Sequence, residues 1–449
     1  MISKGMMAAA ALSAWASSIP SAQAGPVKAS DDAVFYTTRP GDNLYTLARR
    51  YFVRTEDYAR VQRLNRVRDP YRIPVGRVLR IPRAILRHVP LIATVIAQRG
   101  QVAIRHGGQV RFATVGSGVR EDDMVVTTEN AFVSLRLPDG SVVSLPSRST
   151  IGVRRLRRIL LTGGIERLFA LENGRTRAIV TPARNPDDSF RISTPVAVSA
   201  VRGTQFRIRY DPAGVRATTE VLEGHVAVGA ARADAKPALI VPAGFGTLAT
   251  ATGPSGAIGL LPPPALRQPG QVQDEAELRF ALAPLPDASA YRIQIASDAG
   301  FLDVVEETTA PATSLVLPSV PDGTWFVRAS AIDANGIEGV PSTYGFERRL
   351  QHIETSIERR RAGRYREYLF RWTVASAGAG AQRYRFQLRK DASGEPPVVD
   401  ELGLTAGRFV VTDLPPGAYT WRVQSLLLVD GRTFLKWSPI ERLTIARDE

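Results

Sequence analysis

Few residues of this chain have the types and spacing that catalysis requires. Its histidines are scattered one by one along the sequence: His88, His106, His225 and His352. None pairs with another at the helical spacing that holds a metal, and the chain has no cysteine. The adjacent carboxylates Asp122 and Asp123, and likewise Asp187 and Asp188, lie in polar, turn-like stretches that do not favour acid–base chemistry. No nucleophile or phosphate-binding motif occurs in its required context, so we expect no enzyme activity, no metal site and no cofactor.

The densest basic cluster is the run VRRLRR at residues 153–158. Such a cluster either docks an anionic polymer or a partner's acidic face, or is the solvated face of a strand or loop; we favour the solvated face. The chain has 58 Lys and Arg against 43 Asp and Glu, a net charge of +15, which favours anionic partners. This charge is diffuse, however, and no groove-reading helix or aromatic sheet motif occurs, so we expect no nucleic-acid binding.

A β-α-α-β unit is predicted near the N-terminal end. A strand over residues 34–38 precedes a turn, and Asp42 is the expected N-cap of a first helix. One face of that helix is apolar: Leu44, Leu47, Ala48 and Tyr51. Thr55 is the expected cap of a second helix, which ends at Asn65, and apolar alternation up to Pro82 predicts the closing strand.

This unit resembles the lysin motif (LysM), a domain that binds glycans containing N-acetylglucosamine, such as peptidoglycan or chitin. The match spans residues 34–83 and is carried by YTTRPGDNLYTLARRYFV, LNRV and DPYRIPVGRVLRIP. The resemblance implies a groove between the loop after the first strand and the loop before the second. The implied glycan-binding residues are Gly41, Asp42, Asn43, Leu44, Tyr45, Arg72, Ile73 and Pro74.

The implied groove suits an amino sugar. Such a sugar offers an apolar C–H face and an N-acetyl group, which need small apolar or aromatic walls and backbone hydrogen-bonding groups. Asn43 and Tyr45 stand where the family more commonly has Thr and Trp. The alternative for individual residues is purely structural, with Asp42 capping the helix and Leu44 and Tyr45 packing in the core.

The middle of the chain is a series of short predicted strands. Two β-branched runs lie on either side of Pro195, and the run FRIRY at residues 206–210 alternates apolar residues with arginines. Glycine pairs and the dipeptide Asp139-Gly140 supply turn signals between the strands. Repeated short strands with such turns predict a β-sandwich, a barrel or a solenoid, and the sequence leaves that choice open.

Three segments of this region resemble the FecR-type domain of bacterial envelope proteins. They are LPDGSVVSL at 137–145, TPVAVSAVRGTQF at 194–206 and VLEGHVAV at 221–228, and they occur in the family's order. The resemblance covers residues 92–250. It implies contact with another protein, because FecR proteins of iron-uptake systems sit in the inner membrane, contact an outer-membrane receptor and control a sigma factor.

The last part of the chain contains an internal repeat. YRIQI at residues 291–295 corresponds to YRFQL at 384–388, and PDGTW at 321–325 corresponds to PPGAY at 415–419, with offsets of 93 and 94 residues. In the first copy, alternation places Arg292 on the face opposite the apolar side chains. Each copy, with its seven or so short strands, resembles a fibronectin type III-like β-sandwich.

Two stretches of this region are expected to connect domains. Residues 251–271 are rich in glycine and proline and predict a stiff linker before the repeats. Residues 357–367 (IERRRAGRYRE) are expected to be a solvated, basic connector between the two copies. The repeated aromatic residues, such as Tyr419 and Trp421, are expected in the core of the second copy, where they would pack and not stack on carbohydrate.

The first 24 residues predict a signal peptide. Lys4 supplies the positive charge, residues 5–16 are apolar, and Ala22-Gln23-Ala24 offers a cleavage site. The apolar run is too short for a stable membrane span, and no cysteine follows it that could accept a lipid. We therefore expect a periplasmic or secreted protein with no transmembrane anchor after cleavage; an uncleaved N-terminal anchor is the alternative.

These observations predict a mostly β, multidomain protein. Its parts are a signal peptide at 1–24, a LysM-like domain at 34–83, a FecR-like β domain at 92–250, a Gly/Pro linker at 251–271, and two tandem fibronectin type III-like β-sandwiches at 272–350 and 357–449. The favoured function is a non-enzymatic envelope scaffold that binds peptidoglycan or another N-acetylglucosamine-containing glycan and presents surface to an unidentified envelope protein. The alternative is a periplasmic sensing component of FecR type that acts through a partner protein.

Overall fold

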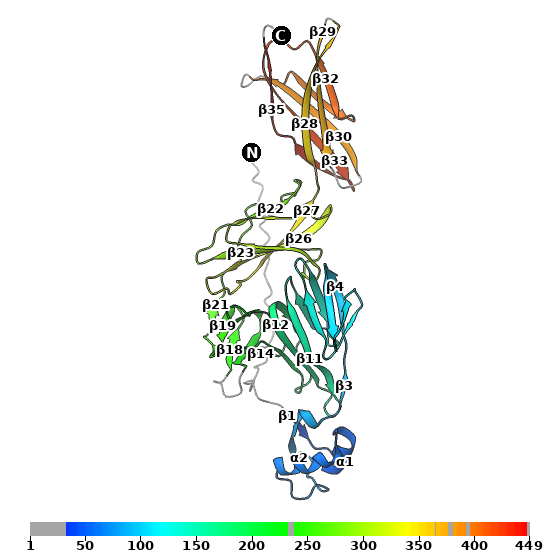
Figure 1. The fold of residues 1–449 in the computed structure, drawn as a ribbon, viewed down its shortest axis with the longest axis vertical. Helices are drawn as coiled ribbons and strands as arrows, with labels where there is room; N and C mark the ends of the chain where they lie inside the picture. Colours follow the sequence, from blue (N-terminus) through cyan, green and yellow to red (C-terminus); the bar gives the residue numbers. More distant parts are fainter. Residues whose placement is uncertain (1–32, 232–237, 364, 376–379, 392–395, 447–449) are drawn as a thin grey trace, which may run out of the picture.

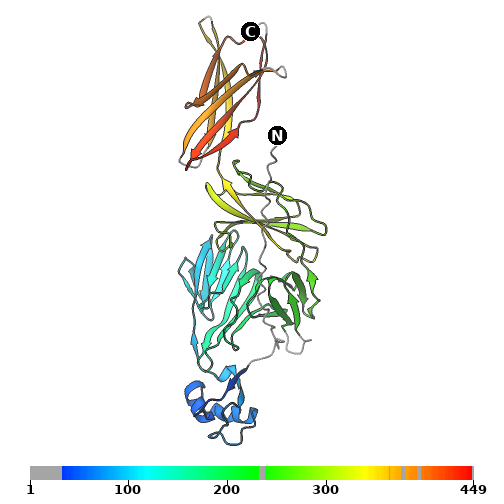
Figure 2. The same ribbon diagram turned by 180° about the vertical axis from the view of Figure 1, so that it is seen from behind.

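The computed structural model describes residues 33–231, 238–363, 365–375, 380–391 and 396–446. The predicted signal peptide lies outside these residues. The described domains follow one another along the long axis of the molecule, with the LysM-like unit at one end and the second sandwich at the other (Figure 1). The view from behind shows the same order, with the central domain lying directly against the first sandwich (Figure 2). Strands dominate every domain except the first, which confirms the mostly β prediction.

The N-terminal unit has the predicted β-α-α-β order with one additional short helix. Its elements are β1 (Ala33–Thr37), α1 (Leu44–Tyr51), the 3-10 helix η1 (Thr55–Asp57), α2 (Tyr58–Leu64) and β2 (Val78–Pro82). β1 and β2 pair antiparallel, with Tyr36 opposite Leu79. Both helices pack on one side of this ribbon through a shared core: Val34, Leu44, Leu47, Phe52, Val61, Leu79 and Ile81.

Both predicted helix caps were wrong. Asn43, not Asp42, caps α1: its side-chain oxygen accepts a hydrogen bond from the backbone N of Thr46 at 2.8 Å. Asp42 is not free for this role because its carboxylate already accepts hydrogen bonds from Tyr36 and a backbone amide. Thr55 opens η1 instead of capping a helix, and the cap residue of α2, Asp57, makes no side-chain cap hydrogen bond.

The short stretch after β2 packs against both neighbouring domains and is not a free linker. It forms the 3-10 helix η2 (Arg83–Ile85) and β3 (His88–Pro90). Ile85 is buried in the LysM-like core, and β3 pairs antiparallel with β11 (Thr150–Ile159) of the central domain. Ile159 of β11 is itself buried in the LysM-like core, so the two domains share apolar contacts.

The central domain is a closed barrel, which settles the choice among sandwich, barrel and solenoid that the sequence left open. Its long strand β12 (Ile165–Ile179) passes from one wall to the other: the first half pairs with β11 and, in parallel, with β13, and the second half pairs with β10 and β15. The remaining strands are β4 (Ala93–Arg99), β5 (Val102–His106), β6 (Gln109–Phe112), β7 (Gly118–Val119), β8 (Met124–Thr127), β9 (Phe132–Arg136), β10 (Val142–Leu145), β13 (Ser189–Ser193), β14 (Ala197–Val201), β15 (Gln205–Asp211), β16 (Arg216–Glu223), β17 (His225–Ala230), β18 (Leu239–Pro242), β19 (Phe245–Thr250), β20 (Gly253–Pro254) and β21 (Ile258–Gly259).

The most patterned stretch of the sequence lies at the centre of this domain. The two runs predicted on either side of Pro195 are the strands β13 and β14, which pair as an antiparallel hairpin with Ser193 opposite Val198. Gly203 ends it with φ +93°, and a Cβ there would lie 2.7 Å from the Cα of Pro182, so this position requires glycine. In β15 the apolar side chains enter the core and the arginines lie on the opposite face, as the alternation predicts.

The repeat predicted for the C-terminal part is present as two sandwiches that share the order of one four-strand sheet path. The first contains β22 (Leu278–Ala281), β23 (Ala290–Ala296), β24 (Val304–Ala310), β25 (Ser314–Leu317), β26 (Gly323–Ile332) and β27 (Ser342–Arg348). The second contains β28 (His352–Ala362), β29 (Tyr365–Ala375), β30 (Ala381–Lys390), β31 (Val399–Leu404), β32 (Arg408–Thr412), β33 (Gly417–Val429), β34 (Arg432–Trp437) and β35 (Glu441–Ile445). The sheet β24-β23-β26-β27 of the first copy matches β31-β30-β33-β34 of the second.

Both expected connectors of this region differ from the prediction. Residues 251–271 do not form a free spacer: β20 and β21 pair with β19, and Leu261 and Leu266 pack on the core of the first sandwich. Residues 357–367 belong to the hairpin of β28 and β29, where Arg360 lies opposite Glu367. The many arginines of this stretch obscure the alternation of apolar and polar residues that indicates a strand, because the exposed faces of both strands are basic or polar.

Candidate glycan-binding site

Two loops at the end of the LysM-like unit enclose an open cleft of about 450 Å³. One loop precedes α1 and the other precedes β2. The cleft is lined by Gly41, Asp42, Asn43, Tyr71, Arg72, Ile73 and Pro74. The unit that carries it occupies one end of the elongated molecule, away from the sandwiches (Figure 1).

The first loop is held by the Asp42 carboxylate. Its Oδ2 atom accepts a hydrogen bond from the hydroxyl of Tyr36 at 2.7 Å and another from the backbone N of Arg39 at 2.7 Å. Burial, together with this hydrogen bond to a carboxylate, raises the pKa of Tyr36 to about 12. Gly41 has φ +88°, a conformation that side-chain-bearing residues rarely adopt, and this allows the tight turn in front of Asp42.

The second loop is tied to the first by hydrogen bonds to two of its backbone carbonyls. The hydroxyl of Thr38 donates to the carbonyl of Pro74 at 2.7 Å. The backbone N of Leu44 donates to the carbonyl of Pro70 at 2.7 Å. Because both carbonyls belong to the loop before β2, the walls of the cleft are positioned relative to each other without a ligand.

Six of the eight predicted residues line the cleft and two do not. Leu44 is fully buried in the domain core, where it packs as an apolar helix residue. Tyr45 is 39% exposed but lies beside the cleft, with its ring centroid 6.0 Å from that of Tyr71 and 6.1 Å from that of Tyr58. The glycan-binding role of all eight residues stays a prediction.

Tyr71 is the lining residue that the sequence interpretation missed. Its side chain is 60% exposed, and its backbone N is held by the Oδ1 atom of Asp69 at 2.9 Å. A signal was present, since Tyr71 directly precedes the predicted Arg72 within the matched motif. An exposed tyrosine beside Ile73 offers the flat apolar wall on which a sugar ring can stack.

The basic run at 153–158 is not a free anion-binding patch. It lies on β11, where Arg155 and Arg157 each bind Glu166 at 2.8 Å and Arg154 binds Glu172 at 2.9 Å. Burial would raise the pKa of Glu166, but the hydrogen bonds and charges of Arg157 and Arg155 outweigh it and lower the pKa. Arg154 and Arg158 are exposed, but Arg157 and Glu166 are largely buried, so the favoured interpretation of a solvated strand face holds for only part of the run.

Comparison with protein-family models matches residues 36–82 to the LysM domain and residues 123–227 to the FecR protein family. The chain contains a LysM domain and a FecR domain. No curated protein gives a significant match. Within the described ranges, no helix is long and apolar enough to cross a membrane, and no group of three or more His, Asp or Glu side chains is placed to hold a metal ion.

Solved structures similar to parts of the chain have low sequence identity. A proposed anti-sigma factor from Parabacteroides distasonis is 18% identical over 30% of this chain and 59% of its own, with a TM-score of 0.24, so the chain spans less than two thirds of that structure. A two-domain fibronectin type III segment of chicken tenascin is 14% identical over 41% of this chain and 99% of its own, with a TM-score of 0.21. Fibronectin(III)-like modules of CbhA from Clostridium thermocellum are 10% identical over 41% of this chain and 94% of theirs, with a TM-score of 0.20.

Proposed function

We propose that this protein is a non-enzymatic scaffold of the bacterial cell envelope that holds peptidoglycan, or another N-acetylglucosamine-containing glycan, through its LysM domain. The cleft between the loops at 41–43 and 71–74 carries the proposal. In this proposal the protein is exported to the periplasm or secreted, and the FecR domain and the two sandwiches present surface to a partner protein.

The chemistry of the cleft supports glycan binding without a charged catalyst. Tyr71 and Ile73 supply apolar wall, and Gly41 leaves one loop without a side chain to block a sugar. The side-chain nitrogen of Asn43 makes no hydrogen bond to any residue that the structure describes, so it is available to an N-acetyl carbonyl.

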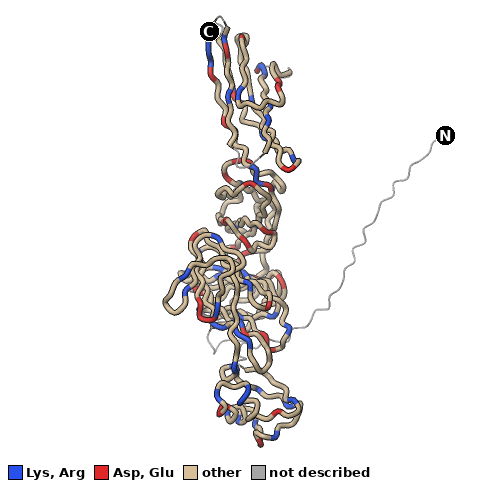
Figure 3. Tube along the Cα trace, turned by 90° about the vertical axis from the view of Figure 1, so that its right-hand side faces the viewer, with Lys and Arg blue, Asp and Glu red and all other residues tan. Residues whose placement is uncertain are grey.

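The test is co-sedimentation of the purified protein with isolated peptidoglycan sacculi at low and high salt. Salt is essential because charges of both signs occur along the whole molecule (Figure 3) and a protein of net charge +15 adheres to anionic wall material by charge alone. We expect binding that resists salt and that weakens at least tenfold in Tyr71→Ala. A factor of this size corresponds to the loss of about one stacked aromatic contact.

Phe35→Ala is the matched control for this test. Phe35 is an aromatic residue of the same domain that is 53% exposed on β1, outside the cleft. The Phe35→Ala substitution should leave binding to the sacculi unchanged. Binding that disappears in high salt, or that falls equally in both variants, would contradict a glycan site in the cleft.

The alternative is a sensing component that acts through a partner protein, and the FecR match over residues 123–227 favours it. Determining the N-terminal residue of the protein isolated from cells separates the two proposals. A mature N-terminus at Gly25 fits the exported scaffold, whereas retention of residues 1–24 fits an anchored signalling component.

A further inference from the structure

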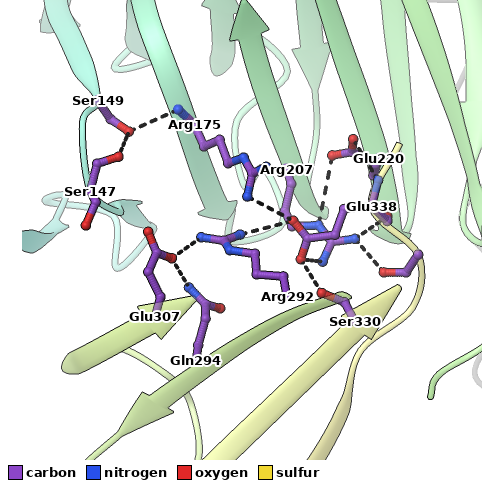
Figure 4. Close-up of polar contacts among 11 residues, drawn as sticks. Ser147, Ser149, Arg175, Arg207, Glu220, Arg292, Gln294, Glu307, Ser330 and Glu338 are labelled. Atoms are coloured by element: carbon purple, nitrogen blue, oxygen red, sulfur yellow. Dashed lines mark hydrogen bonds and ion pairs between the residues drawn. The ribbon is translucent and has the colours of Figure 1, made fainter. Parts of the chain in front are cut away.

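Two polar sheet faces meet between the FecR domain and the first sandwich. On the barrel, β12 and β15 place arginines directly opposite one another, Arg175 against Arg209 and Arg177 against Arg207. The sandwich covers them with β23, which brings Arg292 into the same layer (Figure 4). Like charges opposite each other on adjacent strands are destabilising unless something compensates them.

One carboxylate compensates part of this charge. Glu338, from the loop between β26 and β27, accepts hydrogen bonds from Arg207 at 2.8 Å, from Arg292 at 3.0 Å and from the hydroxyl of Ser330 at 2.6 Å (Figure 4). Burial would raise its pKa, but the charges of Arg207, Arg292 and Arg175 outweigh burial and lower the pKa. Arg292 also binds Glu307.

Arg175 also pairs with Glu338, at 3.9 Å, whereas Arg177 and Arg328 have no hydrogen-bonded carboxylate among the described residues. Arg177 donates to the carbonyl of Gly300 at 2.8 Å, but its buried Nε atom has no hydrogen-bond partner in the described part of the chain. Arg328 lies over the ring of Phe301, with its Cζ atom 3.9 Å from the centroid. Burial and neighbouring arginines lower the pKa of Arg177 to about 10 and that of Arg328 to about 9.

These side chains, together with apolar residues such as Ile208 and Leu302, surround a cavity of about 60 Å³ between the two domains. The cationic residues that line it are Arg175, Arg177, Arg207, Arg209, Arg292 and Arg328. The carboxylates that line it are Glu220 and Glu338, and burial raises the pKa of Glu220, which favours its neutral form. A guanidinium does not give up its proton at neutral pH, so the excess positive charge needs a counter-charge.

The nearest additional carboxylates offset only part of that charge, and none of them lines the cavity. Glu307 is already bound to Arg292. Asp298 accepts hydrogen bonds from the backbone N atoms of Leu302 and Asp303, at 3.0 and 2.8 Å. Glu223 affects Arg177 only through its charge, without a hydrogen bond.

We propose that this cavity binds one small divalent oxyanion of the phosphate or sulfate type. Its volume of about 60 Å³ accommodates roughly four water-sized atoms, which is the number of oxygens in such an anion. The planar guanidinium groups of Arg177 and Arg328 match oxyanion geometry. Because its wall comes from both domains, the bound anion stabilises their contact. This inference is independent of glycan binding.

The test is equilibrium dialysis of the purified full chain against inorganic phosphate and, separately, against sulfate, at an ionic strength held constant with sodium chloride. We expect one saturable oxyanion per chain. Arg209→Gln should weaken binding at least tenfold, and the Arg209 side chain makes no hydrogen bond or ion pair within the described ranges that the substitution would break. Without oxyanion the variant should melt at the same temperature as the wild type or higher, because a repelling charge is gone.

Arg385→Gln is the matched control, since Arg385 takes the position of Arg292 in the second sandwich but is exposed there. It should leave oxyanion binding unchanged. Absence of a saturable site for both anions, or an equal loss in Arg209→Gln and Arg385→Gln, overturns the proposal. If Arg209→Gln fails to fold, Arg328→Gln decides in the same way: retained binding overturns the proposal, and a tenfold loss in a folded variant supports it.

Discussion

The two fibronectin type III-like modules carry the same polar triad on the same sheet, but only the first module buries the arginine of the triad. In the first module the triad consists of Arg292, Gln294 and Glu307, with Gln294 donating to Glu307 at 3.2 Å. The side chain of Arg292 is only 6% exposed. The FecR domain covers this triad and contributes Arg207 to the interface. Glu338 accepts hydrogen bonds from both Arg207 and Arg292.

In the second module the triad consists of Arg385, Gln387 and Asp400. Arg385 binds Asp400 through two hydrogen bonds of 2.6 Å, and Gln387 donates to Asp400 at 3.0 Å. The side chain of Arg385 is 36% exposed, and no other domain covers it among the described residues. The same local arrangement is therefore a surface ion pair in one copy and the centre of a domain interface in the other.

This difference predicts that burial, and not the pairing itself, sets the energetic importance of these residues. Exposed ion pairs contribute little because water and salt screen them. Breaking a buried pair leaves an uncompensated charge in a medium of low dielectric constant. Carboxyl-to-amide substitutions at Glu338 and Asp400 can measure this contrast, because they change charge with almost no change in shape.

The largest effect is expected for Glu338→Gln. Removing this charge leaves Arg207 and Arg292 buried without their shared carboxylate, which should cost about 3–5 kcal/mol in the free energy of unfolding. Urea denaturation followed by tryptophan fluorescence measures it, with limited proteolysis to report whether the two domains separate. A loss no greater than that of an exposed pair would mean that this interface does not form in solution.

A smaller, pH-dependent effect is expected for Glu220→Gln. Burial raises the pKa of Glu220 above its ordinary value of 4.5, so its contribution to stability is full below that pH and is lost as the pH rises through the folded pKa. The amide cannot ionise, so the variant should match the wild type at pH 4 and be at least as stable at pH 7. The pKa of Glu338 is lowered, so the pH dependence of its contribution to stability has the opposite sign: this contribution is lost as the pH falls below about 4.5.

Thermal unfolding of both variants between pH 4 and pH 7 measures this contrast. As the pH rises, the melting temperature of Glu220→Gln should increase relative to that of the wild type, whereas that of Glu338→Gln should decrease relative to it. A Glu220→Gln variant that is strongly destabilised at pH 7 would show that this carboxyl is ionised and pairs with Arg207, which lies 3.9 Å away.

The smallest effect is expected for Asp400→Asn in the second module. It removes the charge that Arg385 binds, but both side chains are partly exposed, so water replaces the lost contact. The unfolding midpoint should not change measurably, and added salt should abolish any residual difference. A loss as large as that of Glu338→Gln would indicate that a partner covers this face in solution.

The polar interface illustrates how far the sequence could lead. Alternation over residues 206–210 and 291–295 correctly predicted both strands and which side chains share a face. Alternation separates two faces but does not identify what covers each of them. Arg207 and Glu338 are 131 residues apart, and no local pattern links them.

The LysM groove was predictable because its determinants lie within one short motif. The positions of Gly41 and Pro74 follow from loops that the motif itself defines. Even here, a contact outside the helix decided which residue caps it. Tyr36, on β1, binds Asp42 and leaves the cap of α1 to Asn43. Local chemistry thus determined the strands and the repeat, and the resemblance to LysM implied the groove, whereas the burial of charge depended on domain packing, because only packing removes water from a polar face.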